Sequence, residues 1–261
     1  MQPEIDLFGL SLKTFGICFG LAFVVSGAIV ARRLKELGKP PDWAYEMVFA
    51  ALIGGLIGAR LYWVLGHTSQ VSDDFVGNVF GGSGLVWYGG ALGGAAGVLL
   101  WAYRKGTLNV HLLDLCSPAL AMGYAVGRVG CQVSGDGDYG DATDLPWGMA
   151  YPDGVVPTTE VVHPTPIYET LAMGFGGWLL WRLRDDLRAG VLFAWYLVLA
   201  GSERFLVEFV RRNDAVLAGL TEAQLFSLVM AGAGATLLVR AARSGGLRRS
   251  RAAPGRGAVP A

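Results

Sequence analysis

Three arginines lie inside or at the edge of long apolar stretches: Arg60, Arg128 and Arg204. A buried guanidinium group costs several kcal/mol of folding free energy unless a negative charge lies beside it. Arg128 belongs to the segment GRVGCQVSGDGDYG, Gly127 to Gly140, in which an apolar run changes abruptly to glycine and aspartate. Each arginine is therefore either held by a carboxylate as part of the fold or placed to bind an anion.

Nearby carboxylates support the first of these interpretations. Glu208 follows Arg204 by four residues, a spacing that places both side chains on one face of a helix. Asp136 and Asp138 follow Arg128 after a short loop. For any single arginine, neutralisation by such a partner explains the charge as well as ligand binding does, so the pairs alone do not decide between the two.

The elements that must position these arginines are expected to be membrane helices. Of the 261 residues, 53% are hydrophobic and only 16% are charged, whereas a soluble domain carries about 25% charged residues. Apolar runs of about 20 residues predict an all-α integral membrane protein with seven transmembrane helices. The expected spans are residues 14–31, 44–65, 85–103, 111–132, 165–181, 189–210 and 221–239. Residues 1–240 are expected to form one membrane domain, and residues 241–261 a basic, disordered tail.

The basic residues predict how the helices are oriented. Of the 21 Lys and Arg residues, 15 follow the first, third, fifth and seventh spans. By the positive-inside rule the N-terminus then lies outside and the C-terminus in the cytoplasm. The outer segments 66–84 and 133–164 are expected to form a small head on the outer side.

With this orientation, ionisable residues from different spans meet at one depth. Arg60, Arg128 and Arg204 lie near the outer ends of the second, fourth and sixth spans, and Tyr88 and His163 near the outer starts of the third and fifth. Three arginines at one depth favour a shared anionic partner over three separate pairs. Guanidinium groups bind phosphate in a bidentate manner, and the phosphate available at this depth belongs to a phospholipid headgroup.

Other motifs are weaker. DGDYGD, residues 136–141, lacks the fifth-position and twelfth-position ligands of a calcium loop, where Gly140 and Trp147 stand. GGSG at 81–84 matches a short pattern of rhomboid proteases, with His163 as a conceivable base, but four residues of a glycine-rich chain carry little weight. The three cysteines show no metal-ligand spacing. Glycines spaced four apart at 54–58 and 89–97 predict close helix packing, with space for an acyl chain as the alternative.

The segment GRVGCQVSGDGDYG resembles the signature of bacterial prolipoprotein diacylglyceryl transferases. Further stretches agree with this family in order and spacing: LIGARLYWVL at 56–65, GGSGLVWYGGALGG at 81–94, HPTPIYE at 163–169, and ERFLVEFVRRND at 203–214 followed by TEAQLFSL. The likeness covers residues 10 to 240. It implies a seven-helix enzyme of the bacterial inner (plasma) membrane with its active site on the periplasmic side.

The resemblance also implies the reaction and its residues. The enzyme would move a diacylglyceryl group from phosphatidylglycerol to the lipobox cysteine thiol in the signal peptide of a preprolipoprotein, and release glycerol phosphate. Arg128 and Arg204 are expected to bind the phosphate, with Arg60 contributing and Glu208 orienting Arg204. Asp136 and Gly140 are expected to belong to the substrate-binding loop. No cofactor, metal or nucleic acid is expected. The chain is expected to be a monomer and to contact membrane lipid.

The sequence departs from the family pattern at three places. Tyr88 stands where members often carry a histidine, Phe15-Gly16 where they carry Tyr-Gly, and Cys131 where they carry an asparagine. The general base is therefore unassigned. Tyr88 and His163 are the candidates, and the alternative is that each only donates a hydrogen bond to a headgroup or helix end.

Two other classes of function compete with the enzyme. A non-catalytic relative would bind phospholipid or lipoprotein without transfer. A transporter would place its charges near the middle of the membrane and show internal repeats, whereas here the charges lie at one face and no repeat is found.

Overall fold

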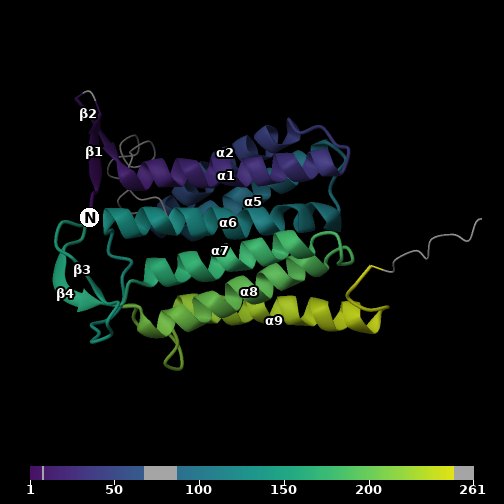
Figure 1. The fold of residues 1–261 in the computed structure, drawn as a ribbon. Helices are drawn as coiled ribbons and strands as arrows, with labels where there is room; N and C mark the ends of the chain where they lie inside the picture. Colours follow the sequence, from purple (N-terminus) through teal and green to yellow (C-terminus); the bar gives the residue numbers. More distant parts are fainter. Residues whose placement is uncertain (8, 68–86, 250–261) are drawn as a thin grey trace, which may run out of the picture.

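Seven long helices make up most of the described chain, which comprises residues 1–7, 9–67 and 87–249 of a computed structural model (Figure 1). They confirm that the seven predicted segments are helical, and several of the helices extend a few residues beyond the apolar runs. The helices are α1 Thr14–Glu36, α2 Trp43–Gly66, α5 Trp87–Arg104, α6 Val110–Ser134, α7 Thr165–Leu183, α8 Val191–Val207 and α9 Glu222–Arg243.

Helix α6 lies in the middle of the bundle (Figure 1). It packs on α1, α7 and α8, while α2 and α5 form a pair beyond α1, and α9 packs on α8. Two groups of buried apolar residues hold these layers together, one between α1, α2, α5 and α6 and the other among α6, α7 and α8. The end of α6 is thereby fixed against the start of α7 and the end of α8.

The α2–α5 pair is held by a glycine seam, formed by Gly54, Gly58, Gly89, Gly93 and Gly97. A Cβ atom added to Gly58 would lie 2.7 Å from Cα of Gly93, and one added to Gly93 would lie 2.8 Å from Cα of Gly58. Both separations are far below an ordinary carbon–carbon contact. The seam therefore confirms the close packing predicted from the glycine spacing.

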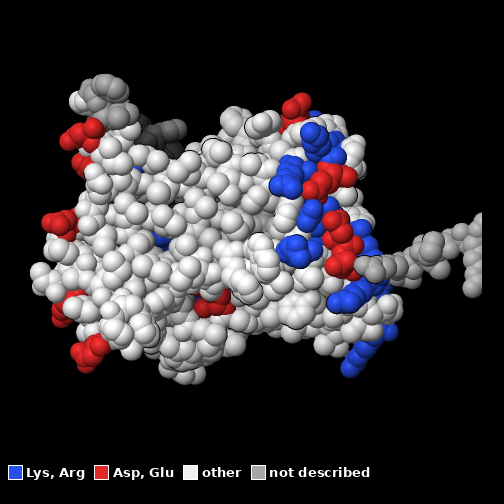
Figure 2. Space-filling view, viewed as in Figure 1, with Lys and Arg blue, Asp and Glu red and all other residues white. Residues whose placement is uncertain are grey.

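The outer surface of the bundle is apolar. Helices α1, α2, α6 and α9 are long and apolar enough to cross a membrane. Large side chains such as Phe49, Ile57 and Val229 are mostly exposed on these helices and their neighbours. Figure 2 shows the same pattern on one face: most charged side chains gather at the two ends, and the band between them is largely uncharged, with small acidic and basic patches. These are the features of a helical membrane protein.

Two short antiparallel hairpins, which the sequence does not predict, add to the helices at one end of the bundle (Figure 1). The first joins β1 Glu4–Leu7 to β2 Leu10–Lys13, and the second joins β3 Met149–Tyr151 to β4 Thr158–Val162. Lys and Arg side chains gather at the opposite end (Figure 2). We name the two ends the hairpin end and the basic end. Helices α6 and α8 finish at the hairpin end, and α7 starts there.

Candidate active site

An ion-pair cluster occupies the junction of α6, α7 and α8 at the hairpin end. Its members are three arginines and three carboxylates: Arg128, Arg204, Arg211, Asp138, Glu169 and Glu208. The carboxylate side chains of Glu169 and Glu208 are fully buried. Buried charges are tolerated only when opposite charges and hydrogen bonds surround them, so the positions of these six side chains depend on one another.

Glu169, in the second turn of α7, is the common partner of all three arginines. Its carboxylate lies 2.9 Å from Nε of Arg128, 3.1 Å from Nη1 of Arg204 and 3.6 Å from Nη1 of Arg211. The hydroxyl of Tyr124, one turn before Arg128 on α6, donates to the same carboxylate at 3.1 Å. Glu169 ends the HPTPIYE segment, and the sequence alone gives it no role in the site.

Glu208 confirms the predicted pairing with Arg204 along one helix face. Nη2 of Arg204 lies 2.7 Å from Oε2 of Glu208. Helix α8 ends at Val207, and Glu208 begins a short 3₁₀ turn, Glu208–Val210. The side chains of Thr221 and Asn213 donate to its other oxygen at 2.8 Å and 2.6 Å. Thr221 also caps α9, so the partner of Arg204 is tied to the neighbouring helix.

Asp138 bridges Arg128 and Arg211, and each of these guanidinium groups donates to one of its two oxygens. Burial disfavours the charged form of Asp138, but the two arginines outweigh it and lower the pKa of this carboxyl to about 2. The sequence predicts a carboxylate partner for Arg128 in this loop, and the structure identifies Asp138 rather than Asp136. It also adds Arg211, which the sequence does not single out.

Gly140 explains how Arg211 reaches the cluster. Its backbone N–H donates to the carbonyl of His163 at 2.8 Å, and Gly140 pairs with Arg211 in an isolated antiparallel bridge. A Cβ atom at this position would collide with the carbonyl oxygen of Val210 and would lie 3.0 Å from Cβ of His163. Only glycine lets the two segments approach this closely, which gives a structural reason for the residue singled out at the end of the signature segment.

Asp136 lies next to the cluster without joining its ion pairs. Its carboxylate accepts the backbone N–H of Asp138 at 3.3 Å. Burial, followed by the negative charge of Asp138, raises the pKa of Asp136. Asp136, Asp138 and Cys131 also lie close enough together to approach a metal ion. Since Asp138 is already paired with two guanidinium groups, a cation would be repelled there, and we assign no metal site.

The other predicted site residues, Arg60, His163 and Tyr88, are not among the members of the ion-pair cluster, so the expected meeting of three arginines holds for Arg128 and Arg204, with Arg211 as the third. The ring of His163 contacts the hydroxyl of Tyr168, with Nδ1 at 3.3 Å. The guanidinium carbon of Arg60 lies 4.8 Å from the ring centroid of Trp63, on α2, which packs mainly on α5 and α1. Tyr88 begins the first turn of α5, but its side chain, like segment 68–86 with the GGSG motif, falls outside the described residues.

A cleft of about 720 Å³ opens beside Asp136. Its walls are the first hairpin, the start of α1 and two turns of the outer loop, including Lys13, Phe15 and Ser134. The cleft therefore reaches from the surface of the hairpin end to the carboxylate next to the cluster.

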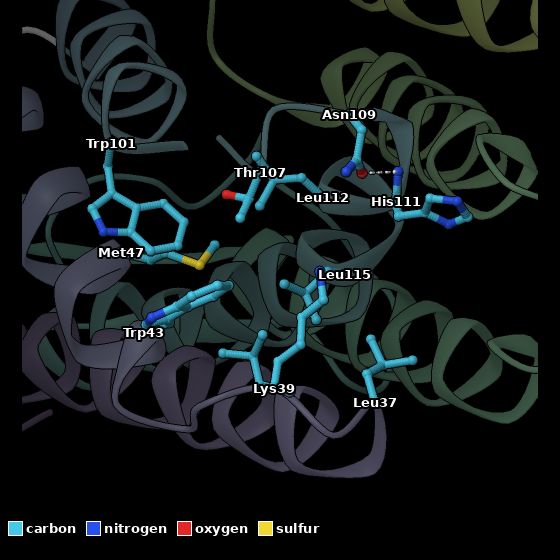
Figure 3. Close-up of a pocket in the computed structure, with 11 residues that line it drawn as sticks. Leu37, Lys39, Trp43, Met47, Trp101, Thr107, Asn109, His111, Leu112 and Leu115 are labelled. Carbon is cyan, nitrogen blue, oxygen red and sulfur yellow. Dashed lines mark hydrogen bonds between the residues drawn. The ribbon is translucent and has the colours of Figure 1, made fainter. Parts of the chain in front are cut away.

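A second hollow lies at the basic end and is too small to be a binding site. Figure 3 shows its mostly apolar walls, formed by residues such as Trp43, Met47, Trp101 and Leu115. Its volume is about 30 Å³, which is about the space that one water molecule takes up in the liquid. Of the two hollows, only the cleft at the hairpin end has a size that suits a substrate.

The cluster has donors left for an anion. Among the described residues, no partner is found for Nη2 of Arg128 or Nε of Arg204. Both side chains are partly exposed, at 15% and 24%. Guanidinium groups held by buried carboxylates are fixed in orientation, so they can receive phosphate oxygens without reorganising. The two interpretations of Arg128 and Arg204 are therefore compatible: each arginine is paired with carboxylates, and each still has an N–H group that could bind an anion.

Comparison with known proteins identifies the family of the chain. The family described as prolipoprotein diacylglyceryl transferase matches residues 4–240. The phosphatidylglycerol–prolipoprotein diacylglyceryl transferase of Clostridium tetani (strain Massachusetts / E88) is 31% identical, over 81% of this chain and 86% of the relative. The enzyme of the same name from Geobacter sulfurreducens is 32% identical, over 92% of this chain and 97% of the relative. The chain therefore belongs to the prolipoprotein diacylglyceryl transferase family.

Proposed function

We propose that this chain transfers the diacylglyceryl group of phosphatidylglycerol to the lipobox cysteine of a preprolipoprotein, as the first step of lipoprotein maturation. The observation that carries the proposal is the Arg128–Glu169–Arg204 arrangement, in which two fixed guanidinium groups keep donors that no described residue occupies, at the end of an apolar bundle. A phospholipid enters such a site from the membrane with its phosphate at the level of the arginines.

The reaction follows from what these groups offer. The cysteine sulfur attacks a glycerol carbon of phosphatidylglycerol, a carbon–sulfur bond forms, and the carbon–oxygen bond to phosphate breaks. The electron pair of that bond leaves with the phosphate oxygen, and glycerol phosphate departs. Arg128 and Arg204 offset the negative charge that gathers on the leaving phosphate. No metal or cofactor takes part.

The other proposed residues support this step. Glu208 orients Arg204, with which it pairs at 2.7 Å. Gly140 holds the loop that carries Asp138, and Asp136 borders the cleft through which the lipobox segment reaches the site. Arg60 contributes positive potential from α2. Tyr88 and His163 remain the candidates from the sequence for proton transfer, or for hydrogen bonds to the headgroup.

We further propose that all seven helices cross the bacterial inner membrane, with the hairpin end on the periplasmic side. The concentration of Lys and Arg at the opposite end supports this orientation (Figure 2). The N-terminus would then lie outside and the tail 241–261 in the cytoplasm, following a single membrane domain over residues 1–240. We also propose that the chain acts as a monomer.

The experiment that tests the function is complementation. The chain is expressed in bacteria depleted of their own diacylglyceryl transferase, together with a lipoprotein from its own source, and lipoprotein processing is followed by gel shift. We expect rescue by the unaltered chain, loss of rescue in Arg128→Ala, and retained rescue in Arg212→Ala, a control that removes a half-exposed arginine paired with Glu160.

The outcome also separates the enzyme from a non-catalytic relative. If the well-expressed unaltered chain leaves the lipoprotein unprocessed, the transferase proposal is wrong. Phosphatidylglycerol binding that depends on Arg128 would then identify a lipid-binding protein instead.

A further inference from the structure

A fourth carboxylate, Glu203, lies next to Arg204 of the ion-pair cluster and forms no ion pair with any residue that the structure describes. Glu203 directly precedes Arg204 on α8. Its Oε1 atom is buried and has no hydrogen-bond partner among the described residues. Buried polar atoms nearly always have a partner, so an exception calls for an explanation.

The surroundings of Glu203 place it at the site. Its charge interacts with Glu169 on α7, with Arg128 on α6, and with Arg204 and Arg211 at the end of α8. Tyr124, which donates to Glu169, also interacts with the charge of Glu203. The carboxylate therefore lies near charged groups of all three helices that form the cluster.

Charge balance distinguishes Glu203 from the other carboxylates. Asp138, Glu169 and Glu208 balance the three arginines, and each accepts hydrogen bonds from them or forms close ion pairs with them. A carboxylate that holds two guanidinium groups is a poor proton acceptor, because protonation would break those pairs. Glu203 forms no such pair among the described residues, so it can accept a proton without breaking one.

We propose that Glu203 is the catalytic base that accepts the thiol proton of the incoming lipobox cysteine. This role rests on the proposed transferase function. The proton moves from sulfur to Oε1 of Glu203, the thiolate forms the carbon–sulfur bond, and the carbon–oxygen bond breaks toward phosphate. The proton on Glu203 returns to solvent after glycerol phosphate leaves. The sequence offers no histidine at position 88, and Glu203 supplies the base from another helix.

The proton transfer also suits the electrostatics of the leaving group. The phosphodiester carries one negative charge, and the released phosphate monoester carries up to two. When Glu203 becomes neutral, the cluster gains one unit of positive charge as the phosphate gains one unit of negative charge. The change on Glu203 therefore stabilises the leaving group, which is where negative charge develops in the transition state.

The test uses the purified full-length chain, phosphatidylglycerol vesicles and a synthetic peptide that carries a lipobox cysteine. In Glu203→Gln we expect kcat to fall by about 100-fold or more, the usual contribution of a general base, with little change in KM for either substrate. The rate of this variant should follow the ionisation of a free thiol, with a pKa of about 8.5, and the pH profile of the unaltered chain should differ from it because Glu203 takes the thiol proton. Glu203→Asp keeps a carboxylate and should retain the pH profile of the unaltered chain at a reduced rate.

A peptide with selenocysteine in place of the cysteine gives a readout that a structural role would not change. A selenol is ionised at neutral pH without a base, so the defect of Glu203→Gln should shrink to less than about tenfold. Tyr88→Phe and His163→Gln should show no such rescue. Glu222→Gln, which changes an exposed glutamate in the first turn of α9, serves as the matched control.

The outcomes separate the two proposals. If the unaltered chain transfers no diacylglyceryl group, the proposed function fails. If the unaltered chain does transfer the group, two results would show that Glu203 is not the base. The first is a Glu203→Gln variant that keeps the rate and pH profile of the unaltered chain. The second is rescue of His163→Gln or Tyr88→Phe, rather than Glu203→Gln, by selenocysteine. A folded Glu203→Gln protein, checked by thermal unfolding and phosphatidylglycerol binding, is required for the comparison, and Glu203→Asp replaces it if Gln unfolds the chain.

Discussion

Replacement of Glu169 by glutamine should lower the stability of the protein far more than an equivalent change at the surface. Glu169→Gln keeps the size of the side chain and one carbonyl oxygen but removes the negative charge. Arg128 is then left with Asp138, Arg204 with Glu208, and the buried cluster carries an excess positive charge.

The magnitude follows from the burial of the carboxylate. Glu169 is fully buried and lies within 3.1 Å of two guanidinium groups. Removal of one partner from a buried ion pair costs about 3–5 kcal/mol of the free energy of unfolding, because the remaining charge is uncompensated. At about 2–4 °C per kcal/mol for a chain of this size, the melting temperature should fall by about 10 °C.

The assay is thermal unfolding of the purified protein in one detergent, with Glu160→Gln as the matched control. Glu160 forms an ion pair with Arg212 at 2.8 Å, but these side chains are 63% and 39% exposed. Such pairs contribute less than about 1 kcal/mol, so the control should melt within about 3 °C of the unaltered chain. Equal melting temperatures for the two variants would show that Glu169 is not the common partner of the arginines.

Two further predictions concern the seam and the loop. Gly93→Ala places a Cβ atom against the backbone of Gly58 and should destabilise the protein by about 1–3 kcal/mol, whereas Gly20→Ala, where nothing lies within 4 Å, should be neutral or stabilising in thermal unfolding. Equal effects would contradict the close approach of α2 and α5. Asp138→Asn should lower the melting temperature by a constant amount between pH 5 and 8. Because the pKa of Asp138 lies at about 2 in the fold against an ordinary 3.8, its ionised form stabilises the fold above about pH 4, and the difference should vanish as the pH falls through 2. A difference that changes between pH 5 and 8 would refute the assignment.

The parts of the fold that depend on local pattern could be predicted from the sequence. Helix length and apolar content predict the seven helices, and the four-residue spacing predicts the pair of Arg204 with Glu208. The hairpins could not be predicted because their strands have only three to five residues. Strands this short, in segments with Gly and Pro, do not show a clear alternation of apolar and polar residues. Arg211 looks like a surface charge in a polar stretch until the 3₁₀ turn and the bridge to Gly140 bring it back to Asp138.

The roles of Glu169 and Glu203 at the site are harder to predict from the sequence. Glu169 lies in a segment already known to be at the right depth, but its role depends on which helices are neighbours, and an amphipathic pattern does not contain that information. Glu203 did carry a signal of its own, as an acidic residue inside an apolar run, which in a membrane protein indicates function by default. The i,i+4 spacing of its neighbour Arg204 and Glu208 predicts an ion pair that leaves Glu203 without an assigned partner.

The glycine seam has a mechanical consequence for the bundle. Where side chains interdigitate, two helices can separate or slide by changing rotamers, but the seam brings backbone against backbone and leaves no rotamers to change. Helices α2 and α5 should therefore move as one rigid body. Motion on this side of the bundle should then occur as a tilt of the α2–α5 pair relative to α1. A cross-link between α2 and α5 should leave every motion of the protein intact, whereas one between α2 and α1 should lock it.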